Sequence, residues 1–237
     1  GADPGTPNVT SGIIAAGAIL QYLSQTEHKK LDHITNLSRI EEEKYVWLDR
    51  FTVRNLELLY SPNADAKTLI DVLDETISPM GGRMLKRWIL LPLKDKKAVD
   101  ERLDVVEHFI KNVNERERLI EEIAKIGDLE RLISKVAAGR VNPREVNQLH
   151  RALLALEPIR ELCLGSKINA VKQLGDQLNL CKTIRDQIRL RLKEDAPVLL
   201  SKGGAIADGV SEELDELRSI AFSGKDHLVQ IQQREML

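Results

Sequence analysis

The chain has 237 residues, of which 42% are hydrophobic and only 3% aromatic. This length is sufficient for one large domain or two small ones with a real hydrophobic core. Few aromatic residues and long Leu/Ile periodicities favour a helical protein over a sheet protein. The formal net charge of −2 gives no broad positive field that would demand a nucleic acid or a membrane surface as partner. Two cysteines make no disulfide framework, and no apolar run reaches the roughly 18 residues of a membrane span, so we expect a soluble, cytoplasmic, helical fragment.

The N-terminal third is predicted to contain a linker, two helices and the only extended segment of the chain. Residues 1–11 hold several Pro and Gly residues and are interpreted as a linker or processing scar. A short helix is expected from about Gly12 to Gln25. Tyr45, Val46 and Trp47 favour one short strand near 44–48. After Asp49 the helical pattern resumes and is expected to stop at residues 61–63.

Helix boundaries in the middle of the chain are marked by capping residues. Ser78 followed by Pro79, and Asn142 followed by Pro143, each give an N-cap and a proline at the first helical position. Asp128 after a glycine can cap a third helix. The helices expected here are Met80–Leu90, Lys94–Lys111, Asn114–Ile126, Leu129–Ala138, one from Pro143 to about Leu164, and two more between Lys167 and Glu194.

The last segment is predicted to be a long helix that needs a partner. After a breaker-rich stretch at residues 195–209, a helix begins near Ser211, and its apolar or small residues recur alternately three and four positions apart. That heptad spacing is typical of a narrow seam covered by another helix. The seam residues are Leu214, Leu217, Ala221, Gly224, Leu228 and Ile231. Because no Gly, Asn or Pro terminates this helix, we expect the chain to be a piece of a larger protein.

One glycine-rich stretch has the spacing of a phosphate-binding loop but lacks its lysine. Gly204 and Gly209 are separated by four residues, as in Gly-x-x-x-x-Gly-Lys-Ser/Thr. Val210 and Ser211 follow, so the side chain that would reach the phosphates is missing. The favoured interpretation is a turn that leads into Ser211 as a helix cap.

A basic stripe is the candidate nucleic-acid site. Lys182, Arg185, Arg189 and Lys193 are three, four and four residues apart, which places them on one face of a helix. Such a stripe could neutralise phosphates. The alternative, which we favour, is a solvated helix face opposite Ile184, Ile188 and Leu192, because acidic residues lie nearby and no aromatic residues are interleaved.

The remaining chemistry-bearing residues do not predict an active site. The histidines, His28, His33, His108, His150 and His227, include no His-x-x-x-His pair and no Cys-x-x-Cys companion, so no metal ligands are predicted. Cys163 and Cys181 have Leu neighbours typical of buried structural thiols. Trp47 and Trp88 are predicted to be core residues. We therefore assign no catalytic, cofactor-binding or metal residues, and expect no enzyme activity or cofactor in this chain.

Four segments, in order along the chain, resemble the core and lever region of the MutS family of DNA mismatch repair ATPases. They are residues 48–58 (LDRFTVRNLEL), 73–88 (LDETISPMGGRMLKRW), 127–131 (GDLER) and 209–218 (GVSEELDELR). The order and spacing of these segments match over nearly the whole chain from about Ala15 to Leu237.

The resemblance implies an all-α, multi-helix bundle with one long protruding C-terminal helix. Residues 12–210 would form the helical core, and residues 211–237 would begin the arm that leads toward a DNA clamp. The longer protein would use ATP and Mg²⁺, bind mismatched double-stranded DNA, form a dimer and act with other repair proteins. The resemblance maps no catalytic or DNA-contacting residue onto this chain.

Three hypotheses therefore stand. The leading one is a non-catalytic lever domain that mechanically couples an ATPase to a DNA clamp, since packed helices shift as units. The alternative is a stand-alone helical scaffold that binds protein partners through the seam of residues 211–237. An enzyme with an acidic helical site has least support. Whether the longer protein acts in repair or in a related recombination task, and the oligomeric state of the chain, stay open.

Overall fold

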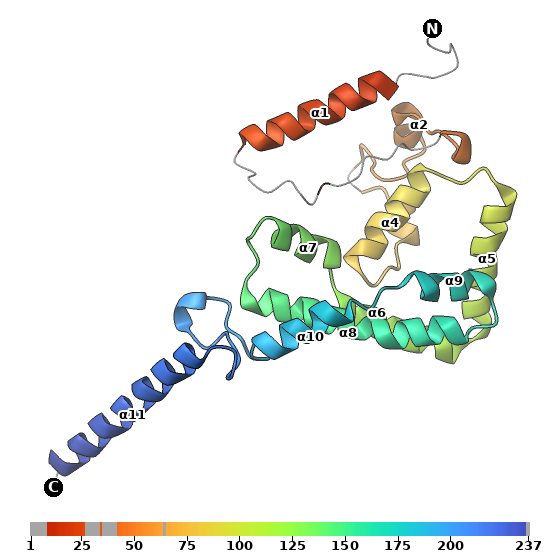
Figure 1. Ribbon diagram of the computed structural model, residues 1–237. Coiled ribbons are helices and arrows are strands. Elements are labelled where there is room, and N and C mark those ends of the chain that lie inside the picture. Colours follow the sequence, from red (N-terminus) through yellow and green to blue (C-terminus); the bar gives the residue numbers. More distant parts are fainter. Residues whose placement is uncertain (1–8, 27–33, 35–41, 64, 236–237) are drawn as a thin grey trace. The chain divides into compact units, whose positions relative to one another are not determined.

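The computed structural model describes residues 9–26, 34, 42–63 and 65–235, with side chains in the last helix described as far as Gly224. These residues form two compact units. The first, here called the N-terminal unit, comprises Gly1–Asp100 and Asp128–Val141. The second, called the bundle unit, comprises Glu101–Gly127 and Asn142–Leu237. The described residues are helical with no named strand, as expected for an all-α protein (Figure 1).

The N-terminal unit contains α1 (Val9–Gln25), the 3₁₀ turn η1 (Glu42–Lys44), α2 (Arg50–Asn55), α3 (Leu69–Leu73), α4 (Pro79–Leu90) and α7 (Leu129–Ala137). The caps expected from sequence are present. The Ser78 hydroxyl accepts a hydrogen bond from the Gly81 amide at 3.1 Å, and the Asp128 carboxylate accepts one from the Arg131 amide at 3.2 Å. Such caps satisfy amides that the first helical turn leaves without partners.

Two expectations in this unit need correction. The segment at 44–48 contains one isolated antiparallel bridge, between Tyr45 and Leu93, and the backbone of Val46 donates to the Pro92 carbonyl at 2.7 Å. A further backbone bond joins the Lys94 amide to the Lys44 carbonyl at 3.0 Å, but within the described residues the pairing stays an isolated bridge and not a strand. The helix after Asp49 ends at Asn55, since Glu57 adopts a left-handed conformation with φ of 48° and reverses the chain.

A short helix in this unit was missed. The helix α3 has only five residues, fewer than a periodic pattern needs to be recognised. It is fixed by a capping box in which the Thr68 side chain accepts from the Asp71 amide while Asp71 accepts from the Thr68 amide at 3.0 Å. Thr68 and Ile70 are buried.

The two tryptophans do not lie in the core. The exposed fraction is 61% for Trp47 and 43% for Trp88. The prediction that they are core residues is therefore wrong for the described part of this chain. Phe51 and Tyr60 of the same unit are exposed as well.

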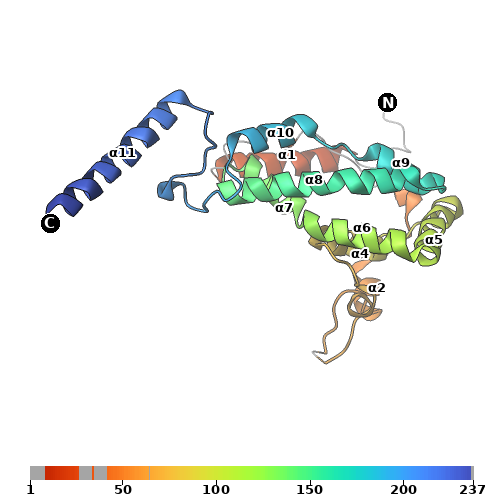
Figure 2. The same cartoon turned by 90° about the horizontal axis from the view of Figure 1, so that it is seen from below.

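The bundle unit is built around one long helix. It contains the larger part of α5 (Lys96–Lys111) together with α6 (Val113–Ile126), α8 (Pro143–Gly165), α9 (Asn169–Gln177), α10 (Lys182–Arg191), the 3₁₀ turn η2 (Leu200–Lys202) and α11 (Glu212–Glu235). The helices α6, α9 and α10 all pack on α8, as Figure 2 shows. The capping box of Asn142 and Glu145 and the following proline start α8 where the sequence predicts.

The core of the bundle unit follows the inner faces of α8 and its neighbours. Its buried apolar residues include Ile126, Leu149, Ala152, Leu153, Ala155, Ile159, Cys163 and Val171. Small residues at the α8–α9 crossing allow close approach, because a Cβ on Gly175 would lie 2.9 Å from the Cβ of Cys163. The stable body from which α11 extends is thus a helical layer organised on α8.

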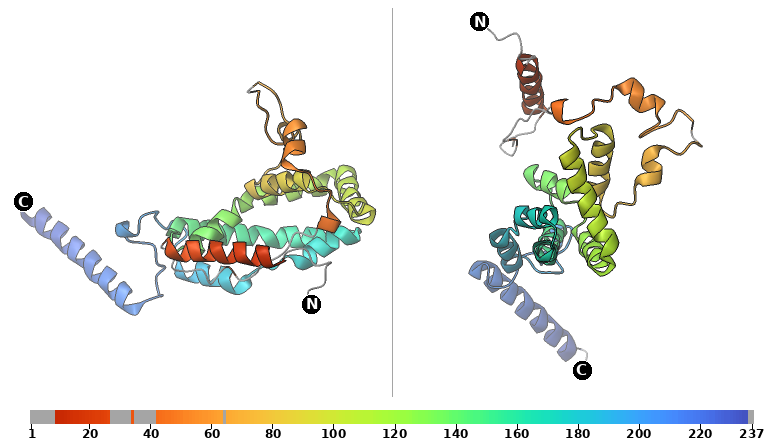
Figure 3. Two further views of the ribbon diagram at one scale, coloured as in Figure 1. Left: turned by 90° about the horizontal axis from the view of Figure 1, so that it is seen from above. Right: turned by 90° about the vertical axis from the view of Figure 1, so that its right-hand side faces the viewer.

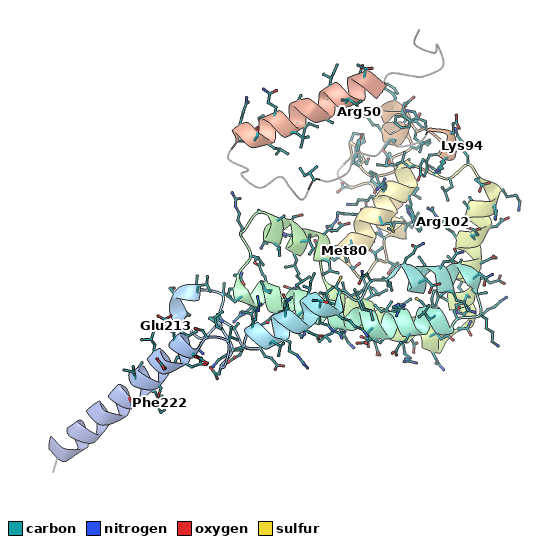
Figure 4. The ribbon with its side chains drawn as sticks, in the orientation of Figure 1. Arg50, Met80, Lys94, Arg102, Glu213 and Phe222 are labelled. Carbon is teal, nitrogen blue, oxygen red and sulfur yellow. The ribbon has the colours of Figure 1, made fainter. Side chains whose placement is uncertain are left out.

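The described part of the final helix, α11, extends away from this layer beyond its base (Figure 3). Of its described apolar side chains, Leu214 at the base is half-buried, whereas Leu217, Ile220 and Phe222 are exposed by 58%, 66% and 71%. Phe222 stands clear of every other drawn element of the bundle unit in Figure 4, and the two views of Figure 3 also show α11 extending alone from that unit. Leu228 and Ile231 of the predicted seam lie outside the described side chains. The expected protruding C-terminal helix is confirmed.

Candidate functional site

The candidate site is the base of α11, where the arm joins the bundle unit. Residues that follow α10 form an isolated antiparallel bridge with the segment before α11, between Leu192 and Ile206. The Lys193 amide donates to the Ala205 carbonyl at 3.0 Å, and the Ala207 amide donates to the Arg191 carbonyl at 2.9 Å. The end of α10 and the start of the arm are thereby tied through their backbones.

A buried amide side chain fixes the same segment to α8. Asn147 is 7% exposed, and its side-chain amide donates to the backbone carbonyls of Lys193 at 2.6 Å and Glu194 at 3.2 Å. A buried polar group needs such partners, because an unpaired one is costly. The chain after α10 is therefore held to the central helix by a specific contact and not by apolar packing alone.

Four charged side chains close the base of α11, and we call them the arm joint: Lys193, Asp208, Asp215 and Arg218. The Arg218 guanidinium donates to the Asp208 carboxylate at 2.8 Å and to the Ile206 carbonyl at 2.9 Å. It also donates to Asp215, one helical turn earlier, at 3.2 Å. The Lys193 ammonium is the second cation on Asp208, and its Nζ atom lies 2.9 Å from the Asp208 Oδ1 atom.

The electrostatics of the arm joint favour its ionised form. Hydrogen bonding and charge from Lys193, with the charge of Arg218, hold the pKa of Asp208 below its usual value. The first turn of α11 carries Glu212, Glu213 and Asp215, which suit the positive end of the helix dipole. The joint therefore pairs two carboxylates with two cationic side chains, and their formal charges balance.

The glycine-rich stretch before α11 is a turn that serves the arm joint. The Gly209 amide donates to the Asp215 carboxylate at 2.7 Å, and Gly209 has a φ of 83°, which a glycine adopts without strain. The Ser211 hydroxyl accepts from the Leu214 amide at 3.3 Å. The predicted turn that leads into a Ser211 cap is confirmed.

The basic stripe is present on α10 and just after it, but its members differ in environment. Arg185 is 12% exposed and pairs with Glu157 of α8 at 2.9 Å. Lys193 belongs to the arm joint. Lys182 and Arg189 are exposed. The structure thus commits two of the four predicted residues to contacts within the bundle unit and leaves two facing solvent.

The described histidines and cysteines lie in structural surroundings. The His108 imidazole contacts the Glu115 carboxylate at 2.9 Å. Burial, followed by the charges of Arg185, Arg189 and Arg151, lowers the pKa of His150. Burial also raises the pKa of the Cys163 thiol, as expected for a structural residue, whereas Cys181 is only half-buried.

No metal-ligand cluster of His, Cys, Asp and Glu occurs among the described residues. Two of the histidines, His28 and His33, fall outside that part of the chain, and the side chain of His227 does too. No helix within the described ranges combines the length and apolarity that a bilayer crossing requires.

A second polar cluster lies in the N-terminal unit and joins two of the sequence segments singled out above. The Arg83 guanidinium on α4 donates to both oxygens of Asp128 at 2.7 and 3.1 Å, and its Nε donates to Glu130 on α7 at 2.7 Å. This planar fork gives directional binding that a lysine would not reproduce. Hydrogen bonding from Arg83 lowers the pKa of Asp128.

Sequence reasoning missed the arm joint, the Asn147 contact and the Arg83 fork. The three-residue spacing of Asp215 and Arg218 was a usable local signal for an ion pair on one helix. The other partners are 10 to 47 positions apart, and only the folded chain brings them together.

The fold and these segments define a helical domain of mismatch repair proteins. Residues 51–236 match the family described as MutS domain III, so the chain belongs to this family. The match does not favour the alternative of a stand-alone scaffold.

Individual relatives agree with this assignment. The chain is 56% identical over 231 residues to the DNA mismatch repair protein MutS of Phocaeicola vulgatus, 57% identical over 231 residues to that of Bacteroides fragilis, and 54% identical over 231 residues to that of Christiangramia forsetii. Each alignment covers 98% of this chain and 26–27% of the relative. The chain thus spans about a quarter of the length of these curated relatives.

Proposed function

We propose that this chain is the lever domain of a mismatch repair ATPase and couples an ATP site to a distant DNA clamp. It is non-catalytic by itself. The single observation that carries the proposal is α11, a helix of 24 residues that leaves the bundle unit with the side chains of Leu217, Ile220 and Phe222 exposed. At 1.5 Å per residue such a helix reaches about 36 Å, which is long enough to carry a displacement away from the bundle.

The longer protein supplies what this chain lacks in the proposal. It hydrolyses ATP with Mg²⁺, binds mismatched double-stranded DNA, forms a dimer and works with other repair proteins in the cytoplasm. Residues 12–210 serve as the core of the lever and residues 211–237 as the start of its arm. The helix from Ser211 pairs with a returning helix of the longer protein, which covers Leu214, Leu217, Leu228 and Ile231 of the predicted seam.

The basic stripe has a minor place in this proposal. Only Lys182 and Arg189 are exposed and free of the contacts that engage Arg185 and Lys193. Two phosphate contacts give weak affinity with only a shallow salt dependence, and they read no sequence. The stripe therefore serves mainly as a solvated helix face, and any auxiliary DNA contact comes from Lys182 and Arg189 and plays no part in mismatch recognition.

The coupling function is tested by breaking the arm in the longer protein. Ser219 is exposed on α11, so Ser219→Pro interrupts the helix while Ser219→Ala leaves it intact and serves as the matched control. A proline in a helix interior costs about 3 kcal/mol or more locally. We expect the proline variant to retain basal ATP hydrolysis but to lose the stimulation of ATP turnover by mismatched duplex, whereas the alanine variant keeps both. Normal stimulation in the proline variant would refute the lever function.

A further inference from the structure

The arm joint has a feature that a simple helix start does not need. A helix N-terminus is satisfied by a cap, and Ser211 already supplies one. Arg218 lies almost two turns into α11, yet its guanidinium reaches back to the loop before the helix and bonds both the Asp208 side chain and the Ile206 backbone. These contacts constrain the helix axis and not merely the first turn.

We propose that Arg218 is the positioning residue that fixes the direction in which α11 leaves the bundle unit. Its three acceptors come from two sides of the joint: Ile206 and Asp208 on the incoming loop, and Asp215 on the helix itself. Asp215 also accepts from the Gly209 amide at 2.7 Å. Tilting α11 or rotating it about its axis breaks at least one of these bonds.

The joint is connected to the central helix through a continuous series of hydrogen bonds. Asn147 on α8 holds the carbonyls of residues 193 and 194, and the Lys193 amide holds the Ala205 carbonyl. The Lys193 ammonium and the Arg218 guanidinium then both bind the carboxylate of Asp208. A displacement of α8 is thereby transmitted to α11 through bonds with defined direction and not through sliding apolar contacts alone.

The chemistry of the joint requires arginine. Isolated surface ion pairs contribute little to stability, but a guanidinium that bonds several acceptors in fixed directions adds geometric specificity. The side chains of Arg218, Asp215 and Lys193 are 29%, 33% and 34% exposed, whereas the shared Asp208 carboxylate is 72% exposed, so the joint is shielded on the side of the helix and open at Asp208. A lysine at residue 218 keeps the charge but cannot reach the loop carbonyl and two carboxylates with one ammonium in the same geometry.

The test measures the direction of α11 within the 237-residue chain. Spin labels are attached to cysteines placed at Gln187 on α10 and Ser219 on α11, both exposed, in a background with Cys163→Ala and Cys181→Ser. Double electron–electron resonance then gives the distribution of distances between the two helices. Arg191→Gln is the matched control, because Arg191 is an exposed arginine at the end of α10 outside the arm joint.

We expect one narrow distribution of the distance between the two spin labels in the parent chain and in Arg191→Gln. Arg218→Gln and Arg218→Lys should each broaden it roughly twofold, since bonds that fix the axis are lost. Amide hydrogen exchange in residues 212–218 should rise about fivefold in Arg218→Gln, the effect of losing about 1 kcal/mol of local stability. An unchanged distribution in both Arg218 variants, or equal broadening in Arg191→Gln, would overturn the inference. Circular dichroism checks that each variant keeps its helices, and Arg218→Lys retains the charge if Arg218→Gln does not fold.

The role of the joint in transmission rests on the proposed lever function, but the two can fail separately. If Arg218→Gln broadens the distances while the longer protein carrying it keeps full stimulation of ATP turnover by mismatched duplex, the positioning role stands and the lever function fails. If the distances stay narrow, the positioning role fails whatever the coupling in the longer protein.

Discussion

The crossing of α8 and α9 allows a sharp test of how closely the bundle unit is packed. A Cβ added at Gly175 would lie 2.9 Å from the Cβ of Cys163, 3.1 Å from the Leu164 amide nitrogen and 3.2 Å from the Arg160 carbonyl oxygen. Two of these atoms are backbone of α8, and the third is the first atom of a side chain. No rotamer change relieves such contacts, so Gly175→Ala must push the two helices apart.

Two opposing effects set the size of this destabilisation. Alanine in a helix interior is favoured over glycine by about 1 kcal/mol. Forcing an extra methyl group into a packed core costs about 1–3 kcal/mol. Because the clash is with backbone atoms, we take the upper half of that range and expect Gly175→Ala to lower the free energy of unfolding by about 1–2 kcal/mol. For a unit of this size, that corresponds to a fall in melting temperature of about 2–8 °C.

A second glycine provides a control of the same chemistry. Gly165 is at the end of α8, and a Cβ there meets no atom within 4 Å. Gly165→Ala should therefore leave the melting temperature unchanged or raise it slightly. Thermal and urea unfolding followed by circular dichroism compares the two variants directly. If Gly175→Ala proves as stable as Gly165→Ala, the close approach of α8 and α9 is not present in solution.

Three further outcomes are expected of the 237-residue chain. Its DNA binding should be weak, salt-sensitive and indifferent to a mismatch. The double variant Lys182→Glu with Arg189→Glu should abolish the binding that a filter-binding assay detects. Submicromolar, mismatch-selective binding at physiological salt would contradict this expectation. The pKa of Asp128 is lowered by Arg83, so the stabilisation from that pair is present above the usual aspartate pKa and is lost as pH falls through the folded value. Urea midpoints of the parent chain and Arg83→Gln should therefore converge in acid, and a constant difference down to full protonation would refute the pairing. Isothermal titration should detect no Mg-ATP binding, because the Gly209 amide is already engaged and no lysine follows it; micromolar affinity would contradict that.

Features that the sequence predicted correctly depend on residues close together in the chain. Ser78-Pro79, Asn142-Pro143, Asp128 and Ser211 mark helix starts through bonds that span three residues, so no tertiary context is needed to recognise them. The all-α class and the protruding last helix follow from periodicity in the same way.

Features that the sequence missed depend on tertiary context. The left-handed Glu57 that ends α2 is a conformation that non-glycine residues seldom adopt, and no local pattern announces it. Trp47 and Trp88 were placed in a core from hydrophobicity alone, but burial depends on what covers a segment. In the basic stripe, Arg185 pairs with Glu157 and Lys193 pairs with Asp208, and these partners lie 28 and 15 positions away in the sequence.

The central claim is that this chain transmits free energy between an ATP site and a DNA clamp, and thermodynamic linkage tests it most directly. The affinity of the longer protein for a mismatched duplex is measured with and without a non-hydrolysable ATP analogue, in the parent sequence and in Ser219→Pro. Coupling between two sites typically changes affinity by about 5–150-fold. We expect the ATP analogue to change the affinity of the parent protein for the mismatched duplex by a factor within that range. In Ser219→Pro the ratio of the affinities with and without the analogue should be close to one, while the affinity for each ligand alone is retained. The same ratio in both proteins would contradict it.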